Sequence, residues 1–194
     1  MKNKRCLILR DSIVLLIMIM ICIRIVYVNT HVRMPEVHSV TQGEPLEYRG
    51  NEYRIQKVNL WKYTDYYETN SNLEQYMDAD EMEKCRVIEV EFQIDLKEED
   101  NVFDPNISIQ CAYDCQGIDP FWFSELNPGL VNGDFHSGDV VVLSYVIYQE
   151  NLTRQQWQQV VDGKMPYTLI FSSYPIKNQM QITDVEKVGL DAEE

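Results

Sequence analysis

The stretch RVIEVEFQIDL, from Arg86 to Leu96, has the clearest β-strand pattern in the chain. From Ile88 onward, apolar residues occupy every second position, and charged or amide residues lie between them. Successive side chains of a strand point to opposite faces of its sheet, so this alternation predicts one buried face and one solvent-facing side. The stretch therefore predicts a strand that forms one wall of a hydrophobic core.

Six further segments with strand-forming sequences lie on both sides of this one. They comprise residues 46–48, 52–61, 107–113, 140–148, 167–172 and 180–185. Turn-forming residues separate them, for example Arg49-Gly50-Asn51. Many short strands with few helices between them are typical of antiparallel sandwiches and argue against βαβ units. We therefore expect a mainly β fold, an antiparallel immunoglobulin-like β-sandwich of about seven or eight strands over residues 44–185.

One or two short helices are expected within the sandwich. Residues 71–84, SNLEQYMDADEMEK, open with the capping-box pattern Ser-x-x-Glu. Residues 153–161, TRQQWQQVV, have Asn151 or Thr153 as the N-cap and Gly163 as the stop signal. The apolar face of the second helix would close one end of the sandwich.

A long apolar run, IVLLIMIMICIRIVYV from Ile13 to Val28, precedes the predicted sandwich. Residues 12–30 would form a helix of about 28 Å, which matches a hydrocarbon core of about 30 Å. Four Lys and Arg residues precede the run, so the positive-inside rule predicts a cytoplasmic segment over residues 1–11 and a C-terminal domain outside. Arg24 lies near the outer end, where its head group can reach the interface. We expect a single-pass protein of the cell membrane, with the bilayer as a partner of residues 12–30.

Three other interpretations of the apolar run are a cleaved export signal, a lipoprotein signal and a buried core helix. A cleavage site needs small residues, and Val28-Asn29-Thr30 is a poor match. Lipidation needs a small residue before the cysteine, whereas Ile21 precedes Cys22. A permanent anchor fits the sequence better than these alternatives.

The charge of the chain changes sign after the apolar run. The first 33 residues hold six of the 17 Lys and Arg residues and one of the 31 acidic residues, so the rest has 11 bases, 30 acids and a net charge of −19. Such a domain repels phosphate backbones, so we expect no nucleic-acid partner. Residues 31–43 contain Pro35 and no periodic pattern, which predicts a stalk. Residues 186–194 are expected to form an acidic tail.

Three segments carry a resemblance to a known class of protein. They are QGEPLEYRGNEYRIQKVNLW (42–61), RVIEVEFQIDL (86–96) and LNPGLVNGDFHSGDVVVLSYVIY (126–148). Together with the N-terminal anchor, they resemble the small exported immunoglobulin-like domains of unknown function found in Gram-positive bacteria. In such domains a glycine turn commonly precedes a long strand, and Ser137-Gly138-Asp139 occupies that place. The resemblance covers residues 41–185 and implies a fold, but it transfers no catalytic residues.

Cysteine spacing leaves the state of the thiols open. Cys85, Cys111 and Cys115 follow the predicted anchor, and an odd number cannot all pair within the chain. They could be unpaired buried thiols, or one disulfide could join two of them. A thiolate zinc site usually needs four ligands, and the sequence contains no C-x-x-C pair.

No motif for a known catalytic mechanism or cofactor is present in the sequence. His136 lies beside Ser137 and near Asp139 in GDFHSGD, but a hydrolase triad needs a base that reaches its nucleophile, and neighbours rarely do. The G-x-S-x-G elbow, the P-loop and G-x-G-x-x-G are all absent. We therefore interpret GDFHSGD as a turn and expect a non-enzymatic protein without a cofactor.

Two acidic clusters offer oxygen ligands of the kind that calcium prefers. Neither has the spacing or the central glycine of an EF-hand, so solvated acidic loops are the competing interpretation. The first cluster, our weak candidate for a calcium site, contains Asp95, Glu98, Glu99, Asp100 and Asp104. The second contains Asp78, Asp80, Glu81 and Glu83.

Two aromatic clusters, WKYTDYY and FWF, form the candidate binding surface. Exposed aromatic side chains make contacts with proteins or sugars, although aromatic residues also fill the cores of sandwiches. The candidate residues are Trp61, Tyr63, Tyr66, Tyr67, Phe121, Trp122 and Phe123.

These observations favour a membrane-anchored extracytoplasmic module that binds another envelope protein or a cell-surface component. A first alternative is an ectodomain that senses or sequesters Ca²⁺ or a cationic peptide through its acidic loops. A second alternative is an envelope hydrolase.

Overall fold

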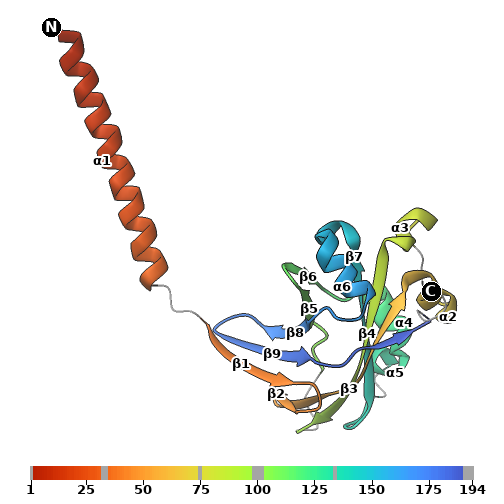
Figure 1. Ribbon diagram of the computed structural model, residues 1–194. Coiled ribbons are helices and arrows are strands. Elements are labelled where there is room, and N and C mark those ends of the chain that lie inside the picture. Colours follow the sequence, from red (N-terminus) through yellow and green to blue (C-terminus); the bar gives the residue numbers. More distant parts are fainter. Residues whose placement is uncertain (1, 32–34, 74–75, 98–102, 133–134, 190–194) are drawn as a thin grey trace. The chain divides into compact units, whose positions relative to one another are not determined.

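The computed structural model describes residues 2–31, 35–73, 76–97, 103–132 and 135–189 (Figure 1). The chain divides into two compact units, Met1–Pro35 and Glu36–Glu194.

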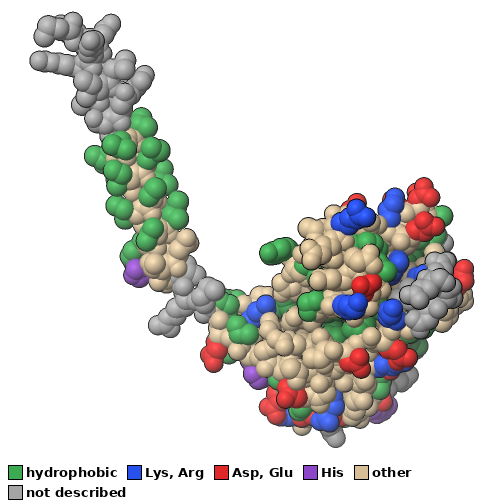
Figure 2. Space-filling model, viewed as in Figure 1, with side chains coloured by type: hydrophobic (Ala, Val, Ile, Leu, Met, Phe, Trp, Pro, Cys, Tyr) green, Lys and Arg blue, Asp and Glu red, His purple; other side chains and the backbone are tan. Residues whose placement is uncertain are grey.

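The first unit is the helix α1 (Lys2–His31). Its segment Ile13–His31 has 19 residues and a mean hydropathy of 2.4, so it is long and apolar enough to cross a membrane. Hydrophobic side chains cover most of the face of this segment that Figure 2 shows, and none of the segment is buried within the protein. A long apolar helix of this kind is typical of a membrane anchor and of a signal sequence, and it coincides with the segment over which the sequence predicts a span, residues 12–30.

The second unit is a β-sandwich of two five-stranded sheets. The first sheet has the order β1-β9-β8-β5-β6, and the second has the order β10-β3-β4-β7 with β2 paired to β3. The strands of the first sheet are β1 (Glu36–Thr41), β5 (Ser108–Cys111), β6 (Asp114–Gln116), β8 (Tyr167–Ser172) and β9 (Ile176–Ile182). Those of the second are β2 (Leu46–Tyr48), β3 (Asn51–Lys62), β4 (Cys85–Leu96), β7 (Val140–Tyr148) and β10 (Glu186–Val188).

The main core lies between the two sheets and is built from the inward residues of their strands. On β4 the alternation is as predicted, because Val90 and Phe92 are fully buried while Glu91 between them is half-buried. The ring of Phe171 on β8 meets that of Tyr53 on β3 at 5.0 Å. Aromatic contacts between the facing sheets confirm the expected β-sandwich.

The boundaries of β2, β7 and β8 are those predicted, whereas β1, β6 and β10 are additional strands. Residues 36–41 do not form a stalk, because β1 pairs in parallel with β9 over its whole length. The predicted acidic tail likewise contains β10, which pairs in parallel with β3. Both segments lie at the edges of their sheets. Their backbones complete the ladders while most of their side chains stay exposed, so neither sequence shows the alternation of a core strand.

The helix α6 (Arg154–Val161) is confirmed, with a capping box between Thr153 and Gln156. The other predicted helix is shorter. The helix α3 (Ala79–Glu83) begins at a capping box between Asp78 and Glu81, and part of residues 71–84 lies outside the described residues. The structure adds the helices α2 (Tyr63–Thr69), α4 (Pro120–Leu126) and α5 (Pro128–Asn132), and the short 3-10 helix η1 (Gln149–Asn151).

Candidate functional site

The two aromatic clusters pack against each other on the solvent side of the second sheet. Tyr63 and Tyr66 of α2 and Trp122 of α4 are almost fully buried. The ring of Trp122 lies 5.6 Å from that of Tyr63 and 5.7 Å from that of Tyr66. Val87 of β4 belongs to the same cluster, so α2 and α4 form a second, smaller core over β4. These three aromatic residues stabilise the fold and are not a binding surface.

The other four predicted surface residues do not form one patch either. Trp61, Tyr67 and Phe123 are half-buried and pack against the two cores. Phe121 is 64% exposed and is the well-exposed member of the set. The expectation of a shared aromatic surface is therefore wrong, because α4 packs on α2 and covers it. The two helices are about fifty residues apart in the chain, so the sequence does not show this contact.

The structure does not bring the calcium candidates together among the residues that it describes. Asp104 forms an ion pair with Arg49 and accepts a hydrogen bond of 2.8 Å from the Asn106 amide. Asp95 accepts a hydrogen bond of 3.3 Å from Gln93. Glu98, Glu99 and Asp100 lie outside the described residues. No group of three or more potential metal ligands occurs in the part of the chain that is described.

The second acidic cluster serves the local structure of α3. The carboxylate of Asp78 accepts a hydrogen bond of 2.9 Å from the Glu81 backbone, and Glu81 accepts one of 3.3 Å from the Asp78 backbone. These bonds satisfy amide groups at the start of the helix that would otherwise lack partners.

Residues 135–139, the described part of GDFHSGD, form the predicted turn before β7. The Ser137 hydroxyl accepts a hydrogen bond of 2.8 Å from the Leu96 backbone, which ties the turn to the end of β4. The carboxylate of Asp139 accepts a hydrogen bond of 2.7 Å from the His136 backbone. Gly138 has a φ of 93°, a left-handed conformation that glycine adopts without strain. These contacts explain the segment as a structural turn.

Cys22, Cys85, Cys111 and Cys115 carry free thiols. Cys111 and Cys85 are buried, and burial raises the pKa of the Cys111 thiol to about 12 and that of the Cys85 thiol to about 11. Cys115 is exposed, and its strand register places it opposite Gln110 instead of Cys111. The sequence left unpaired thiols and one disulfide open as alternatives, and the structure has unpaired thiols at these positions.

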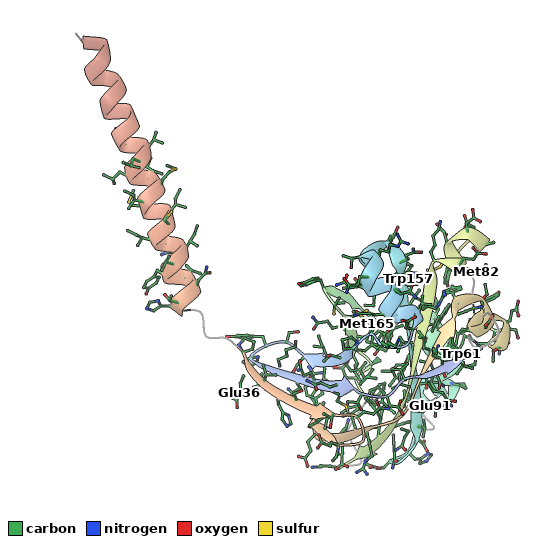
Figure 3. The ribbon with its side chains drawn as sticks, viewed as in Figure 1. Glu36, Trp61, Met82, Glu91, Trp157 and Met165 are labelled. Atoms are coloured by element: carbon green, nitrogen blue, oxygen red, sulfur yellow. The ribbon has the colours of Figure 1, made fainter. Side chains whose placement is uncertain are left out.

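A groove of about 640 Å³ lies at the end of the second sheet, between α3 and α6. Figure 3 shows Trp157 on α6, and Met82 marks α3 on the other side. We call this feature the α3–α6 groove. Its apolar lining consists of Met77, Cys85, Tyr148, Leu152 and Trp157, and its polar lining of Glu81, Lys84, Gln149, Glu150 and Arg154.

Backbone pairing and a ring contact hold the walls of the α3–α6 groove in place. Cys85 and Tyr148 are register partners of β4 and β7 at its base. The backbone amide of Gln149 donates a hydrogen bond of 2.9 Å to the carbonyl of Lys84, which joins η1 to the residue after α3. The guanidinium of Arg86 lies 5.3 Å from the centre of the Trp157 ring, within range of a cation–π contact. These contacts fix the positions of the two walls of the groove relative to each other.

The rim of the groove carries charges of both signs. Glu81 is engaged in the capping of α3, whereas Glu150 is exposed on η1. Among the described residues, Lys84 and Arg154 form no ion pair with a carboxylate. Both of these cations are exposed.

Sequence patterns did not reveal the groove, because two segments more than sixty residues apart build it. The one available signal was the apolar face of the helix at residues 154–161. Val160 on that face is fully buried in the main core, as expected. Trp157, one turn earlier, is only half-buried and lines the groove.

No protein-family model matches the chain, and no curated protein sequence matches it. Among solved structures, an uncharacterized β-sandwich protein from Clostridium difficile 630 aligns with a TM-score of 0.41 and 10% identity, over 77% of this chain and 96% of that one. A candidate lipoprotein from Bacillus subtilis strain 168 aligns with a TM-score of 0.40 and 11% identity, over 73% of this chain and 38% of that one. The assignment of the sandwich rests on the strand pairing within this chain.

Proposed function

We propose that the protein is a single-pass, membrane-anchored binding module with its β-sandwich outside the cytoplasm. It holds a short peptide segment of another envelope protein in the α3–α6 groove, and it acts by binding without catalysis. The observation that carries the proposal is the groove of about 640 Å³ with an apolar floor and a charged rim.

The groove has the dimensions and the chemistry of a recognition site. Ligand pockets in proteins measure about 300–1,000 Å³ and combine an apolar lining with a few polar groups. Tryptophan and tyrosine carry much of the binding energy at interfaces, and Trp157 and Tyr148 both line the groove. Methionine adapts its shape to different partners, and Met77 lies on the same floor.

Charge complementarity indicates the kind of peptide that fits. The rim offers the cations Lys84 and Arg154 together with the carboxylate of Glu150. A segment with one apolar side chain between residues of opposite charge would fill the floor and pair with the rim. Such rim pairs contribute mainly to specificity and to the rate of association.

The length and composition of α1 support permanent anchoring. Ile13–His31 fits the thickness of a bilayer, and Val28-Asn29-Thr30 is a poor match to the small residues that a cleavage site needs. The basic residues before the helix favour a cytoplasmic N-terminus.

Selection of random peptides displayed on phage tests the groove, with the full-length protein held in detergent micelles. We expect the selected peptides to share an apolar residue with charged neighbours. Gln149→Trp should abolish their binding, because a large side chain from the rim fills the groove. Gln155→Trp is the matched control, since Gln155 is exposed on α6 and does not line the groove. Equal binding to both variants would reject the groove as the site.

Membrane fractionation tests the anchor independently of the groove. The full-length protein should stay in the membrane pellet after a carbonate wash, and protease added outside intact cells should digest the sandwich. A mature form that begins after Val28 would contradict the anchor.

A further inference from the structure

Acidic residues are distributed unevenly over the sandwich. Residues 163–183, which contain β8 and β9, include no Asp or Glu, although the chain after residue 33 has 30 of them. The neighbouring strand β1 contains one, Glu36. The three adjacent strands β1, β9 and β8 therefore form a region with almost no negative charge in a strongly acidic domain.

Apolar side chains are exposed at one end of this region. Tyr174, in the turn between β8 and β9, is 80% exposed, and Ile176 at the start of β9 is 43% exposed. Val37 on β1 is 55% exposed. The parallel register places Glu36 beside Ile176 and Val37 beside Lys177, so these residues share one end of the sheet. We call this end the β8–β9 tip, and Figure 2 shows hydrophobic side chains at the edge of the domain where β1 begins.

Hydrogen bonds hold the tip in a defined shape. The Ser172 hydroxyl donates a bond of 2.8 Å to the Ile176 carbonyl and accepts one of 2.9 Å from the Asn178 amide. The Asn178 side chain also lies 3.2 Å from the Nδ1 of His38 on β1. These bonds join the two strands on either side of the turn that carries Tyr174.

The covalent chain limits how far the tip can be from the end of the apolar helix. His31 ends α1, and Glu36 begins β1 beside Ile176. The five residue steps between them reach at most roughly 18 Å. The interfacial layer on each side of a bilayer is about 5–8 Å thick. The chain therefore cannot place the start of β1, and with it the tip, farther than roughly 18 Å from the end of α1.

We propose that the β8–β9 tip is a second membrane contact, with Tyr174, Ile176 and Val37 seated in the interfacial layer of the bilayer. Tyrosine is enriched in that layer because its ring is apolar and its hydroxyl is polar. The lack of acidic side chains on β8 and β9 removes the repulsion that the rest of the domain would meet at an anionic surface. This inference rests on the membrane anchoring in the proposed function and adds the orientation of the sandwich at the membrane.

Tyr174→Trp places a depth probe at the tip of the full-length protein, reconstituted into phosphatidylcholine vesicles with and without brominated acyl chains. We expect the emission added by the new tryptophan, relative to the wild-type protein, to shift to shorter wavelength and to be quenched by the brominated lipid. Tyr113→Trp is the matched control, because Tyr113 is 98% exposed in the turn between β5 and β6. That turn lies at the other end of the first sheet, since Cys111 pairs with Tyr167 at the start of β8. The control should show neither the shift nor the quenching.

Carbonate pelleting of the same samples separates the two possible failures. If the protein pellets with the vesicles and Tyr174→Trp is not quenched, the tip contact is rejected while the anchor stands. If both probes are quenched equally, the sandwich lies on the lipid without a preferred end, which also rejects the inference. If the protein does not pellet, the anchor and the inference fail together.

Discussion

At the scale of single residues, Asn127 takes the place of a strand at an open sheet edge. Its side chain donates a hydrogen bond of 2.8 Å to the Val142 carbonyl and accepts one of 2.8 Å from the Val142 amide. Val142 belongs to β7, the last strand in the order of its sheet. Asparagine side chains present a carbonyl and an amide together, so Asn127 satisfies the backbone as a neighbouring strand would. The sequence shows only Asn-Pro-Gly, which predicts a turn and no more.

Asn127→Ala should destabilise the sandwich by about 2–4 kcal/mol, because it leaves two backbone groups of β7 without partners. Urea unfolding measures the loss, and hydrogen exchange should show faster exchange of the Val142 amide. Asn151→Ala is the control, because Asn151 is exposed and its hydrogen bond to Asp114 is 3.2 Å long. Its effect should stay within about 0.5 kcal/mol. Equal effects of the two substitutions would refute the structural role of Asn127.

The buried thiols make stability depend on pH in the alkaline range. The pKa of Cys111 is raised to about 12 from an ordinary 9.0 by burial. Between these values the folded state keeps a proton that the unfolded state has lost, so stability falls as pH rises. From pH 9 to pH 11, Cys111 should account for a loss of about 2 kcal/mol. Urea unfolding of the wild-type protein and of Cys111→Ala across this range measures it. A parallel decline in both proteins would show that Cys111 does not contribute.

At the scale of elements, α2 and α4 depend on the aromatic contacts that join them. Trp122 is 2% exposed and its neighbour Phe121 is 64% exposed. Trp122→Ala should therefore cost about 3–5 kcal/mol through the cavity that it leaves. Phe121→Ala should cost less than about 1 kcal/mol, since exposed substitutions have small effects. Chemical unfolding of the two variants compares them directly, and similar losses would contradict the burial of the second core.

Elements with a periodic apolar pattern could be predicted from the sequence, and those without one could not. The strand at 86–96 is periodic because one of its faces lies against the core, and residues 140–148 were found with their observed bounds. The strand β1 has only Val40 packed against the core, so EVHSVT resembles a linker. The strand pairs with β9 through its backbone. Backbone pairing does not depend on the type of side chain, so the sequence of β1 does not indicate it.

The candidate site could not be predicted, because it depends on contacts between distant segments. WKYTDYY and FWF were identified as functional candidates, yet each covers the other in the folded chain. The α3–α6 groove requires the pairing of Cys85 with Tyr148, which follows from the register of two long strands. Its rim residues are ordinary surface charges when they are considered one at a time.

At the scale of the whole molecule, the sandwich places its two candidate contacts apart. Figure 1 shows α3, beside the groove, at the opposite end of the domain from the turn between β8 and β9. If the β8–β9 tip rests on the lipid, the groove opens away from the membrane and stays accessible to a partner. The acidic residues lie mainly outside β1, β9 and β8, so the charge of the domain favours the same orientation.

The boundary between the two units predicts different outcomes for two nearby truncations. The main core consists of residues from the sandwich, and the apolar segment of α1 is not buried by the protein. Deletion of residues 1–35 should therefore give a soluble domain with the same unfolding free energy as the full-length protein in detergent. Deletion of residues 1–41 also removes β1, a strand of six residues. At about 0.5–1.5 kcal/mol for each backbone hydrogen bond, the loss of this ladder should cost roughly 3 kcal/mol or more.

The longer deletion should also change the solution behaviour of the domain. Without β1, the edge of β9 is open, and unpaired strand edges promote association between chains. Urea unfolding and gel filtration of the two fragments at matched concentration measure stability and association together. If residues 36–41 were only a stalk, both fragments would be monomers of equal stability. A difference between them would instead establish these six residues as part of the sandwich. The β8–β9 tip lies next to the point where the chain enters the domain only if β1 pairs with β9 in this way.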